Sequence, residues 1–293
     1  MTTDVVIGTI SGYDFPTVQY WANSLDACGF TGRKVVLVCN AARNVVEALV
    51  GRGYEVVTYA TDPVSGDAYY PVQGFANEDA SAERFYLMWA YLRSTGGPFR
   101  YVISTDVKDL VFQTNPSEWL ESTMGDGELT VSSERLRYED EDWNSTSLLE
   151  NFGSAIHEHM RREVIWNAGA IAGTASCMRD LCLSVHLLCR ASKTAYSDQA
   201  ALNIILSLEP FRRITRFNHT EAGWACHAGT FAPPWIAEKY GPKLLETGSS
   251  FDGDSVRTSS GIKYCLVHQY DRVPDWRDAL RAKYSNSTAR TGR

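Results

Sequence analysis

The chain has 293 residues, of which 44% are hydrophobic and 22% are charged, and its formal net charge is −7. This composition is ordinary for a folded globular protein and argues against disorder, because enough apolar surface is present to build a substantial core. The acidic balance also argues against nucleic acid as a partner, since a phosphate-backbone footprint normally needs a basic face.

The hydrophobic runs of the sequence are shorter than a membrane span. No stretch reaches the roughly 20 apolar residues that a membrane span needs, and the first strand-like run starts without a basic region or cleavage site. We therefore expect no stable membrane insertion and a cytoplasmic location. The seven cysteines form no CxxC pair, so we expect them to be reduced and mainly buried.

Apolar strand-like runs alternate with helical runs at the start of the chain. Strands are predicted over 5–10, 34–39 and 55–58, and helices over 18–28 and 44–52. A polar, aromatic-rich loop over 61–77 precedes an amphipathic helix over 81–93, which a breaker segment over 94–98 ends. The next strand begins at Tyr101 and would be the fourth, in the middle of the sheet. This rhythm predicts an α/β fold with a central, mostly parallel sheet flanked by helices.

The second half of the chain is less regular. We predict a strand over 128–133, a strand or loop over 165–174, a charged and aromatic loop over 135–144, and helices over 147–162, 178–193 and 198–208. The polar tail over 285–293 is expected to be mobile.

The strand that begins at Tyr101 leads directly into two carboxylates, Asp106 and Asp109. In an open α/β sheet the ligand crevice lies beyond the carboxyl ends of the strands, so acids at this point face a ligand rather than the core. Hard divalent cations take oxygen ligands, and Mg²⁺ usually leaves positions for phosphate oxygens. The placement predicts a metal-bound diphosphate, the alternative being a simple turn or helix cap.

Five blocks with distinctive residues follow one another along the chain. They are Glu83-Arg84-Phe85, Ser104 to Gln113 with Asn115-Pro116, Trp166 to Gly169, Ser197 to Asn203, and Val267 to Arg272. In this order they resemble a GT-A nucleotide-sugar glycosyltransferase, over about residues 4 to 275. The resemblance implies one Rossmann-like GT-A domain over 1–284, with a nucleotide-binding half at about 1–115 and an acceptor half at 116–284.

The resemblance implies a metal site. In such enzymes an Asp-x-Asp element holds a divalent cation that bridges the diphosphate, and a late histidine often completes the coordination. Asp106, Asp109 and His268 would accordingly bind Mn²⁺ or Mg²⁺. The spacing departs from the family pattern, because Ser104 and Lys108 stand where the partner acid of Asp106 is expected. Lys108 would replace part of the charge of the metal beside the diphosphate, and the alternative for His268 is an ordinary core or surface histidine.

The resemblance also assigns residues to the donor. Gly8, Thr9 and Ser11 follow or end the first strand and would cradle the nucleoside. Arg84 would reach the donor from its helix, and Arg272 would contact phosphate. The alternative for both arginines is a surface charge in a local ion pair.

Asp198 and Gln199 would lie beside the sugar, with Asn167 and Gly169 lining the same pocket. A carboxylate there would orient hydroxyls or stabilise the oxocarbenium-like charge of the transition state. Glu134 is a candidate acceptor contact, and Asp198 or Glu134 would be the base of an inverting enzyme. The alternatives are a helix N-cap for Asp198 and a tight turn for Asn167 and Gly169.

The function expected from these residues is metal-assisted transfer of a sugar from a nucleotide diphosphate-sugar donor to a hydroxyl acceptor, either a glycan or a small molecule. A nucleotidyltransferase would use a similar sheet and acidic site, but it needs a glycine-rich basic stretch for a triphosphate, which the N-terminal sequence does not offer. The other alternative is a metal-independent or inactive sugar- or nucleotide-binding module, which Lys108 inside the acidic element favours. Release of free nucleoside diphosphate would separate an enzyme from such a module.

Overall fold

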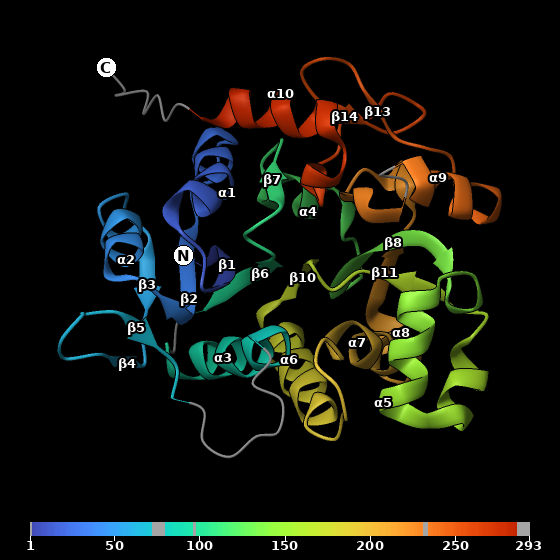
Figure 1. The fold of residues 1–293 in the computed structure, drawn as a ribbon, viewed down its shortest axis with the longest axis horizontal. Helices are drawn as coiled ribbons and strands as arrows, with labels where there is room; N and C mark the ends of the chain where they lie inside the picture. Colours follow the sequence, from blue (N-terminus) through green and yellow to red (C-terminus); the bar gives the residue numbers. More distant parts are fainter. Residues whose placement is uncertain (1, 72–79, 96–97, 231–233, 286–293) are drawn as a thin grey trace.

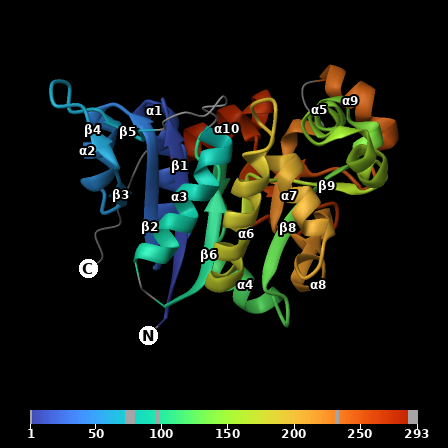
Figure 2. The ribbon, with the colours of Figure 1, turned by 90° about the horizontal axis from the view of Figure 1, so that it is seen from below.

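The computed structural model describes residues 2–71, 80–95, 98–230 and 234–285. A central sheet crosses the molecule, and helices cover both of its faces (Figure 1, Figure 2). The first elements are β1 (Thr3–Ser11), α1 (Phe15–Ala27), β2 (Arg33–Ala41), α2 (Arg43–Val50) and β3 (Glu55–Val57). All five were predicted, with ends displaced by at most three residues. Helix α1 begins early because the Asp14 side chain accepts a hydrogen bond from the Thr17 amide and caps it.

The predicted loop over 61–77 is wrong in part. Two short strands, β4 (Ala60–Thr61) and β5 (Ala68–Tyr69), pair antiparallel with each other, and β5 also pairs with β2. Residues 72–77 of the loop lie outside the described residues, as do 96–97 of the breaker segment. Between these gaps, α3 (Ala80–Ser94) agrees with the predicted helix. The following strand, β6 (Phe99–Thr105), is the sixth in chain order rather than the fourth, but it does lie in the middle of the sheet.

The later elements differ more from the sequence prediction. They are β7 (Leu110–Phe112), α4 (Pro116–Thr123), β8 (Leu129–Arg137), α5 (Asp142–Met160), β9 (Val164–Trp166), β10 (Ala170–Thr174), α6 (Ala175–Cys189), α7 (Asp198–Ser207), α8 (Phe211–Ile214) and β11 (Thr215–Asn218). The predicted strand or loop over 165–174 is two strands with a turn between them. The predicted loop over 135–144 is wrong over most of its length, because β8 continues to Arg137 and Glu141 caps α5, accepting hydrogen bonds from the Trp143 and Asn144 amides. Helix α5 is kinked at Gly153, whose φ is 84°.

The strand order of the large sheet is β11-β8-β10-β6-β1-β2-β5-β4, with β3 also paired to β2 and β9 to β8. Strand β1 pairs in parallel with β2 and β6, as β2 does with β3 and β11 with β8. Strand β10 lies antiparallel between β6 and β8, so β6 and β8 point the same way. The sheet is therefore largely parallel, as predicted, and the carboxyl ends of β1, β6 and β8 meet at one edge.

A small second sheet completes that edge. Strand β12 (Ala225–His227) pairs in parallel with β15 (Leu266–His268), which pairs antiparallel with β7. Around it lie α9 (Pro234–Tyr240), the hairpin of β13 (Ser250–Phe251) and β14 (Val256–Arg257), and α10 (Pro274–Tyr284) (Figure 1). Because β7 directly follows the acidic segment after β6, this sheet brings the C-terminal part of the chain to the central strand.

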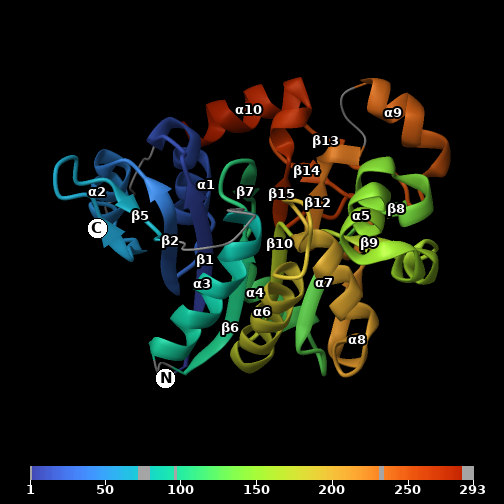
Figure 3. The ribbon, with the colours of Figure 1, turned by 60° about the horizontal axis from the view of Figure 1, so that its bottom comes forward.

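Successive side chains of the central strands point to opposite faces of the sheet, and each face carries its own hydrophobic core. Val6 and Ile10 of β1 belong to the cluster under α1 and α2, while Val5 and Ile7 belong to the cluster under α3, α6 and α7. Figure 3 shows the latter three helices along one face. The period of two is what a strand buried on both faces requires.

Two expectations about the chain as a whole can be checked. Among the described helices, none has the length and apolar character to cross a membrane. All seven cysteines are free; Cys182, Cys189, Cys226 and Cys265 are buried, and the other three are half-buried.

Candidate functional site

A cavity of about 910 Å³ opens at the carboxyl edge of the sheet. Its volume lies within the range of typical small-molecule sites. Of the fourteen residues singled out from the sequence, thirteen line it. These are Thr9, Ser11, Arg84, Asp106, Lys108, Asp109, Glu134, Asn167, Gly169, Asp198, Gln199, His268 and Arg272.

The remaining candidate, Gly8, is buried inside β1 and lies outside this wall. A Cβ at Gly8 would collide with the Val107 side chain and meet the Trp21 ring at 3.0 Å. The glycine is thus explained by the close packing of β1 against the segment after β6. Thr9 and Ser11, the next residues along the strand, do face the cavity.

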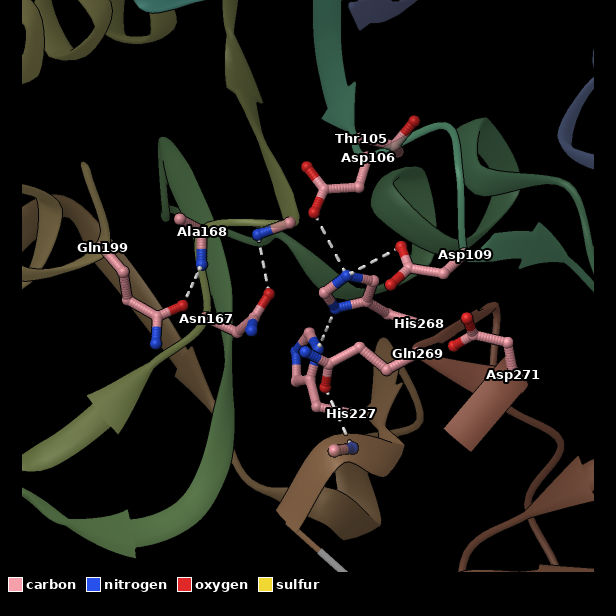
Figure 4. A network of polar contacts seen from close by, with 12 residues as sticks. Thr105, Asp106, Asp109, Asn167, Ala168, Gln199, His227, His268, Gln269 and Asp271 are labelled. Atoms are coloured by element: carbon pink, nitrogen blue, oxygen red, sulfur yellow. Dashed lines mark hydrogen bonds and ion pairs between the residues drawn. The ribbon is translucent and has the colours of Figure 1, made fainter. Parts of the chain in front are cut away.

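Asp106, Asp109 and His268 form the centre of the site. Asp106 directly follows β6, Asp109 precedes β7, and His268 ends β15, so one ligand atom from each lies within 4.8 Å of the others. His268 Nε2 is 3.2 Å from an Asp106 carboxylate oxygen and 3.4 Å from one of Asp109 (Figure 4). The backbone fixes both acids, because the Asp106 amide donates to the Gly169 carbonyl and the Gln269 amide donates to the Asp109 carbonyl.

Two carboxylates face the imidazole of His268 in this group. Burial disfavours the charged imidazolium of His268, but Asp109 and Asp106 outweigh it and raise its pKa to about 10. Burial likewise disfavours the charged form of Asp106, yet Arg84 and His268 hold its pKa well below the usual range. Two carboxylates and an imidazole nitrogen are a donor set suited to Mn²⁺ and similar ions. The residues therefore fit a divalent cation, which would take the place of the His268 proton.

Arg84 connects this centre to α7. Its guanidinium forms an ion pair with Asp106, lies 2.7 Å from Asp198 Oδ2, and donates to the Ala168 carbonyl at 3.1 Å. Its side chain is only 12% exposed, so it is not a solvated surface charge. Asp198 begins α7 with its carboxylate in this ion pair, and the cap residue Ser197 makes no side-chain cap bond.

Glu134 lies at the centre of a buried amide network. Asn167 Nδ2 and Gln199 Nε2 donate to its Oε1 at 2.6 and 3.0 Å, and Gln199 Nε2 also donates to Asn144 Oδ1. Burial raises the pKa of Glu134, and the nearby Glu141 adds to the effect. The neighbouring Arg135 has a φ of 65°, within an irregular part of β8. Strained backbone of this kind re-aims side chains beside functional sites.

The turn between β9 and β10 is held by the same network. Gln199 Oε1 accepts from the Ala168 amide at 3.1 Å, and Asn167 Oδ1 accepts from the Gly169 amide at 2.6 Å (Figure 4). A Cβ at Gly169 would lie 2.5 Å from His268 Cε1 and 2.8 Å from its Nε2. Glycine is needed here because the backbone touches the imidazole, not because of a special turn conformation.

The two remaining cations lie at the same wall of the cavity. Lys108 is exposed, and Arg272 is half-exposed, with Nη2 3.7 Å from Asp109 Oδ2 and Nε 3.2 Å from Asp271 Oδ1. Both positions put positive charge beside the carboxylates without closing the cavity.

Three tryptophans of the C-terminal two thirds of the chain differ in their relation to this cavity. Trp143 is 55% exposed and lines the cavity, whereas Trp224 is fully buried and donates to the Ala170 carbonyl. Trp235 is exposed but does not line the cavity. Tyr13 and Tyr240 line it as well.

A second cavity, of about 460 Å³, adjoins the first through Ser11 and Ala80. Asn40, Tyr70 and Glu83 are among its lining residues. The sequence reasoning missed this cavity, because its walls come from β2, β5 and α3, which only the fold brings together. It also missed His227, which contacts His268 and carries no recognisable sequence motif.

No protein-family model and no curated protein matches this chain. Among solved structures, mouse Xyloside xylosyltransferase 1 in its apo form is similar, with a TM-score of 0.51 and 14% sequence identity. The match covers 91% of this chain and 97% of that chain. At this identity the similarity concerns the fold alone. The chain has a mixed α/β, glycosyltransferase-like Rossmann fold.

Proposed function

We propose that this protein is a glycosyltransferase that moves a sugar from a nucleotide diphosphate-sugar to a hydroxyl acceptor with the help of Mn²⁺ or Mg²⁺. The observation that carries the proposal is the convergence of Asp106, Asp109 and His268 in a large cavity at the carboxyl end of a central strand. Ligands of open α/β sheets bind at this edge.

Asp106, Asp109 and His268 would hold the cation, and Lys108 and Arg272 would add positive charge beside the diphosphate. When bound, the divalent ion supplies Lewis-acid stabilisation of the departing diphosphate. Arg84 holds Asp106 and Asp198 in fixed positions, so it organises the donor pocket rather than bearing an exposed charge.

The donor and acceptor would occupy opposite ends of the cavity. Thr9, Ser11 and Tyr13 line the end near β1, where the second cavity adjoins and offers room for the nucleoside. Glu134 and Trp143 line the end near α5. An exposed indole and a carboxylate in one cavity suit an acceptor with both apolar CH faces and hydroxyl groups, as a glycan or a hydroxylated small molecule has.

Asp198 and Glu134 are the two acids available for chemistry on the sugar. Asp198 lies in the ion pair with Arg84, and its carboxylate would stabilise positive charge developing on the sugar ring. Glu134 has a raised pKa, which makes its carboxylate a better proton acceptor and fits the role of base toward the acceptor hydroxyl. We assign Gln199 to positioning, since its side-chain amide is already engaged by Glu134, Asn144 and the Ala168 amide.

In this proposal residues 1–284 act as one domain. The nucleotide would be bound mainly by residues 1–115 and the acceptor mainly by 116–284. The metal ligands come from both parts, because Asp106 and Asp109 belong to the first and His268 to the second.

The test is release of nucleoside diphosphate and transfer of sugar from a panel of nucleotide-sugar donors in the presence of Mn²⁺. Asp106→Asn should abolish both while the variant stays folded, and Asp126→Asn, at an exposed turn, is the matched control. Near-normal turnover by folded Asp106→Asn protein would contradict the assignment. No release from any donor by the wild type would favour the inactive binding module.

A further inference from the structure

Two histidines lie side by side at the ends of neighbouring strands. His227 ends β12 and His268 ends β15, and the parallel register pairs them directly. Their Nδ1 atoms are 3.0 Å apart, and the ring planes are nearly perpendicular, at 86° (Figure 4). Each residue is 3% exposed, so this contact is shielded from solvent.

The contact fixes where the protons lie. A hydrogen bond between two nitrogens needs one donor, and an imidazole that binds a cation through Nε2 carries its proton on Nδ1. His268 Nε2 faces Asp106 and Asp109. With a cation at Nε2, His268 Nδ1–H is the donor and His227 Nδ1 is the acceptor.

On the side that faces His268, the His227 ring offers a hydrogen-bond acceptor, Nδ1. A ring nitrogen that accepts a hydrogen bond carries no proton, so accepting at Nδ1 leaves the ring proton of His227 on Nε2. That Nε2 is buried and has no hydrogen-bond partner within the described part of the chain. A buried polar atom without a partner is costly, and such atoms are concentrated at functional sites.

The surrounding backbone holds the two strand ends together. Gln269, directly after His268, has a φ of 58°, and its Oε1 accepts from the Gly229 amide at 2.9 Å. A Cβ at Gly229 would collide with the Gln269 amide group, so only glycine permits this approach. These contacts, together with the pairing of β12 and β15, hold His227 and His268 next to each other.

We propose that His227 is a positioning residue for metal binding: by accepting a hydrogen bond from His268 Nδ1, it sets the tautomer and orientation that aim Nε2 at the cation. The proposal rests on the metal site of the proposed function. Partners of this kind, which hold the far nitrogen of a ligating histidine, usually change metal affinity by about 10- to 100-fold.

The experiment measures Mn²⁺ binding by electron paramagnetic resonance in full-length protein. His227→Leu keeps bulk but removes the acceptor, and it should weaken Mn²⁺ binding by about 10- to 100-fold. His227→Asn places an oxygen near the position of Nδ1 and should bind close to the wild type. His186→Leu is the matched control, since His186 is also buried with an unpartnered ring nitrogen in the described structure, but lies in α6.

Wild-type affinity in folded His227→Leu protein would overturn the role of His227 while leaving the metal site intact. Absence of Mn²⁺ binding to the wild type would overturn the metal site and this role together. Equal losses in the leucine and asparagine variants would show a packing role and also overturn the proposal.

A measurement on the wild type avoids dependence on a variant that fails to fold. Long-range ¹H–¹⁵N spectra of protein with labelled histidine and bound Mg²⁺ report which nitrogen of each ring is protonated. The proposal expects a proton on Nδ1 of His268 and on Nε2 of His227. A proton on Nε2 of His268 in the Mg²⁺-bound protein would overturn it.

Discussion

Gly169→Ala tests whether the turn between β9 and β10 determines the position of His268. The added Cβ would lie 2.5 Å from His268 Cε1, and ordinary contacts start at 3.4 Å, so the ring must retreat by about 0.9 Å. If the backbone moves instead, Asp106 moves with it, because the Asp106 amide donates to the Gly169 carbonyl. Either way one proposed metal ligand is displaced.

The size of the displacement decides the outcome. Metal–ligand distances tolerate about 0.2 Å, several times less than the retreat required here. We therefore expect Mn²⁺ affinity to fall by at least about 10- to 100-fold, the range seen when ligand orientation alone is disturbed. The overpacking should also lower the free energy of unfolding by about 1–3 kcal/mol.

Urea unfolding and Mn²⁺ titration, followed by electron paramagnetic resonance, measure the two effects separately. Gly173→Ala is the matched control: its Cβ would collide with the Glu128 carbonyl and the Leu129 side chain, far along β10 from the metal ligands. It should lose comparable stability and keep its Mn²⁺ affinity. Unchanged Mn²⁺ affinity in folded Gly169→Ala protein would refute the reasoning.

Three further outcomes are expected. Because burial raises the pKa of Glu134 in the folded state, this group makes the wild type less stable as the pH rises above about 4.5. The Tm of Glu134→Gln relative to the wild type should therefore increase from pH 4 to pH 8, and a Tm difference that does not change with pH would contradict the raised pKa. Arg84→Met should lower the free energy of unfolding in urea by about 3 kcal/mol, because it removes the positive charge beside the buried Asp198 carboxylate. The double variant with Asp198→Asn should recover part of that loss, and strictly additive changes in the free energy of unfolding would contradict the ion pair. Trp143→Ala should raise the KM for the acceptor, Trp143→Phe should raise it less, and both variants should keep the nucleotide affinity of the wild type. A fall in nucleotide affinity would instead assign Trp143 to the donor side of the cavity.

The sequence predicted best those features that depend on residues close to one another in the chain. The strand and helix order up to α2, and the placement of Asp106 at the end of a central strand, follow from local periodicity and were predicted correctly. The loop over 135–144 was predicted wrongly because its polar residues suggested solvent, whereas Glu141 caps a helix from within it. Charge alone does not reveal that a side chain is capping.

Other parts of the site depend on contacts between distant segments. Arg84 meets Asp106 and Asp198 across 22 and 114 residues, so no local pattern could distinguish this ion pair from a surface charge. The raised pKa of Glu134 and the contact of His227 with His268 likewise arise only when β8, β12 and β15 come together.

The most direct test of the central claim is thermal unfolding of the wild type and Asp106→Asn with UDP, GDP, ADP, CMP and dTDP, each with and without Mn²⁺. A ligand that binds only the native state stabilises it by about 2.7 kcal/mol at one hundred times its Kd. We expect one nucleotide to raise the Tm of the wild type only when Mn²⁺ is present, and to leave the Tm of Asp106→Asn unchanged. An equal rise without Mn²⁺, or in the variant, would contradict a metal-bridged nucleotide at this site.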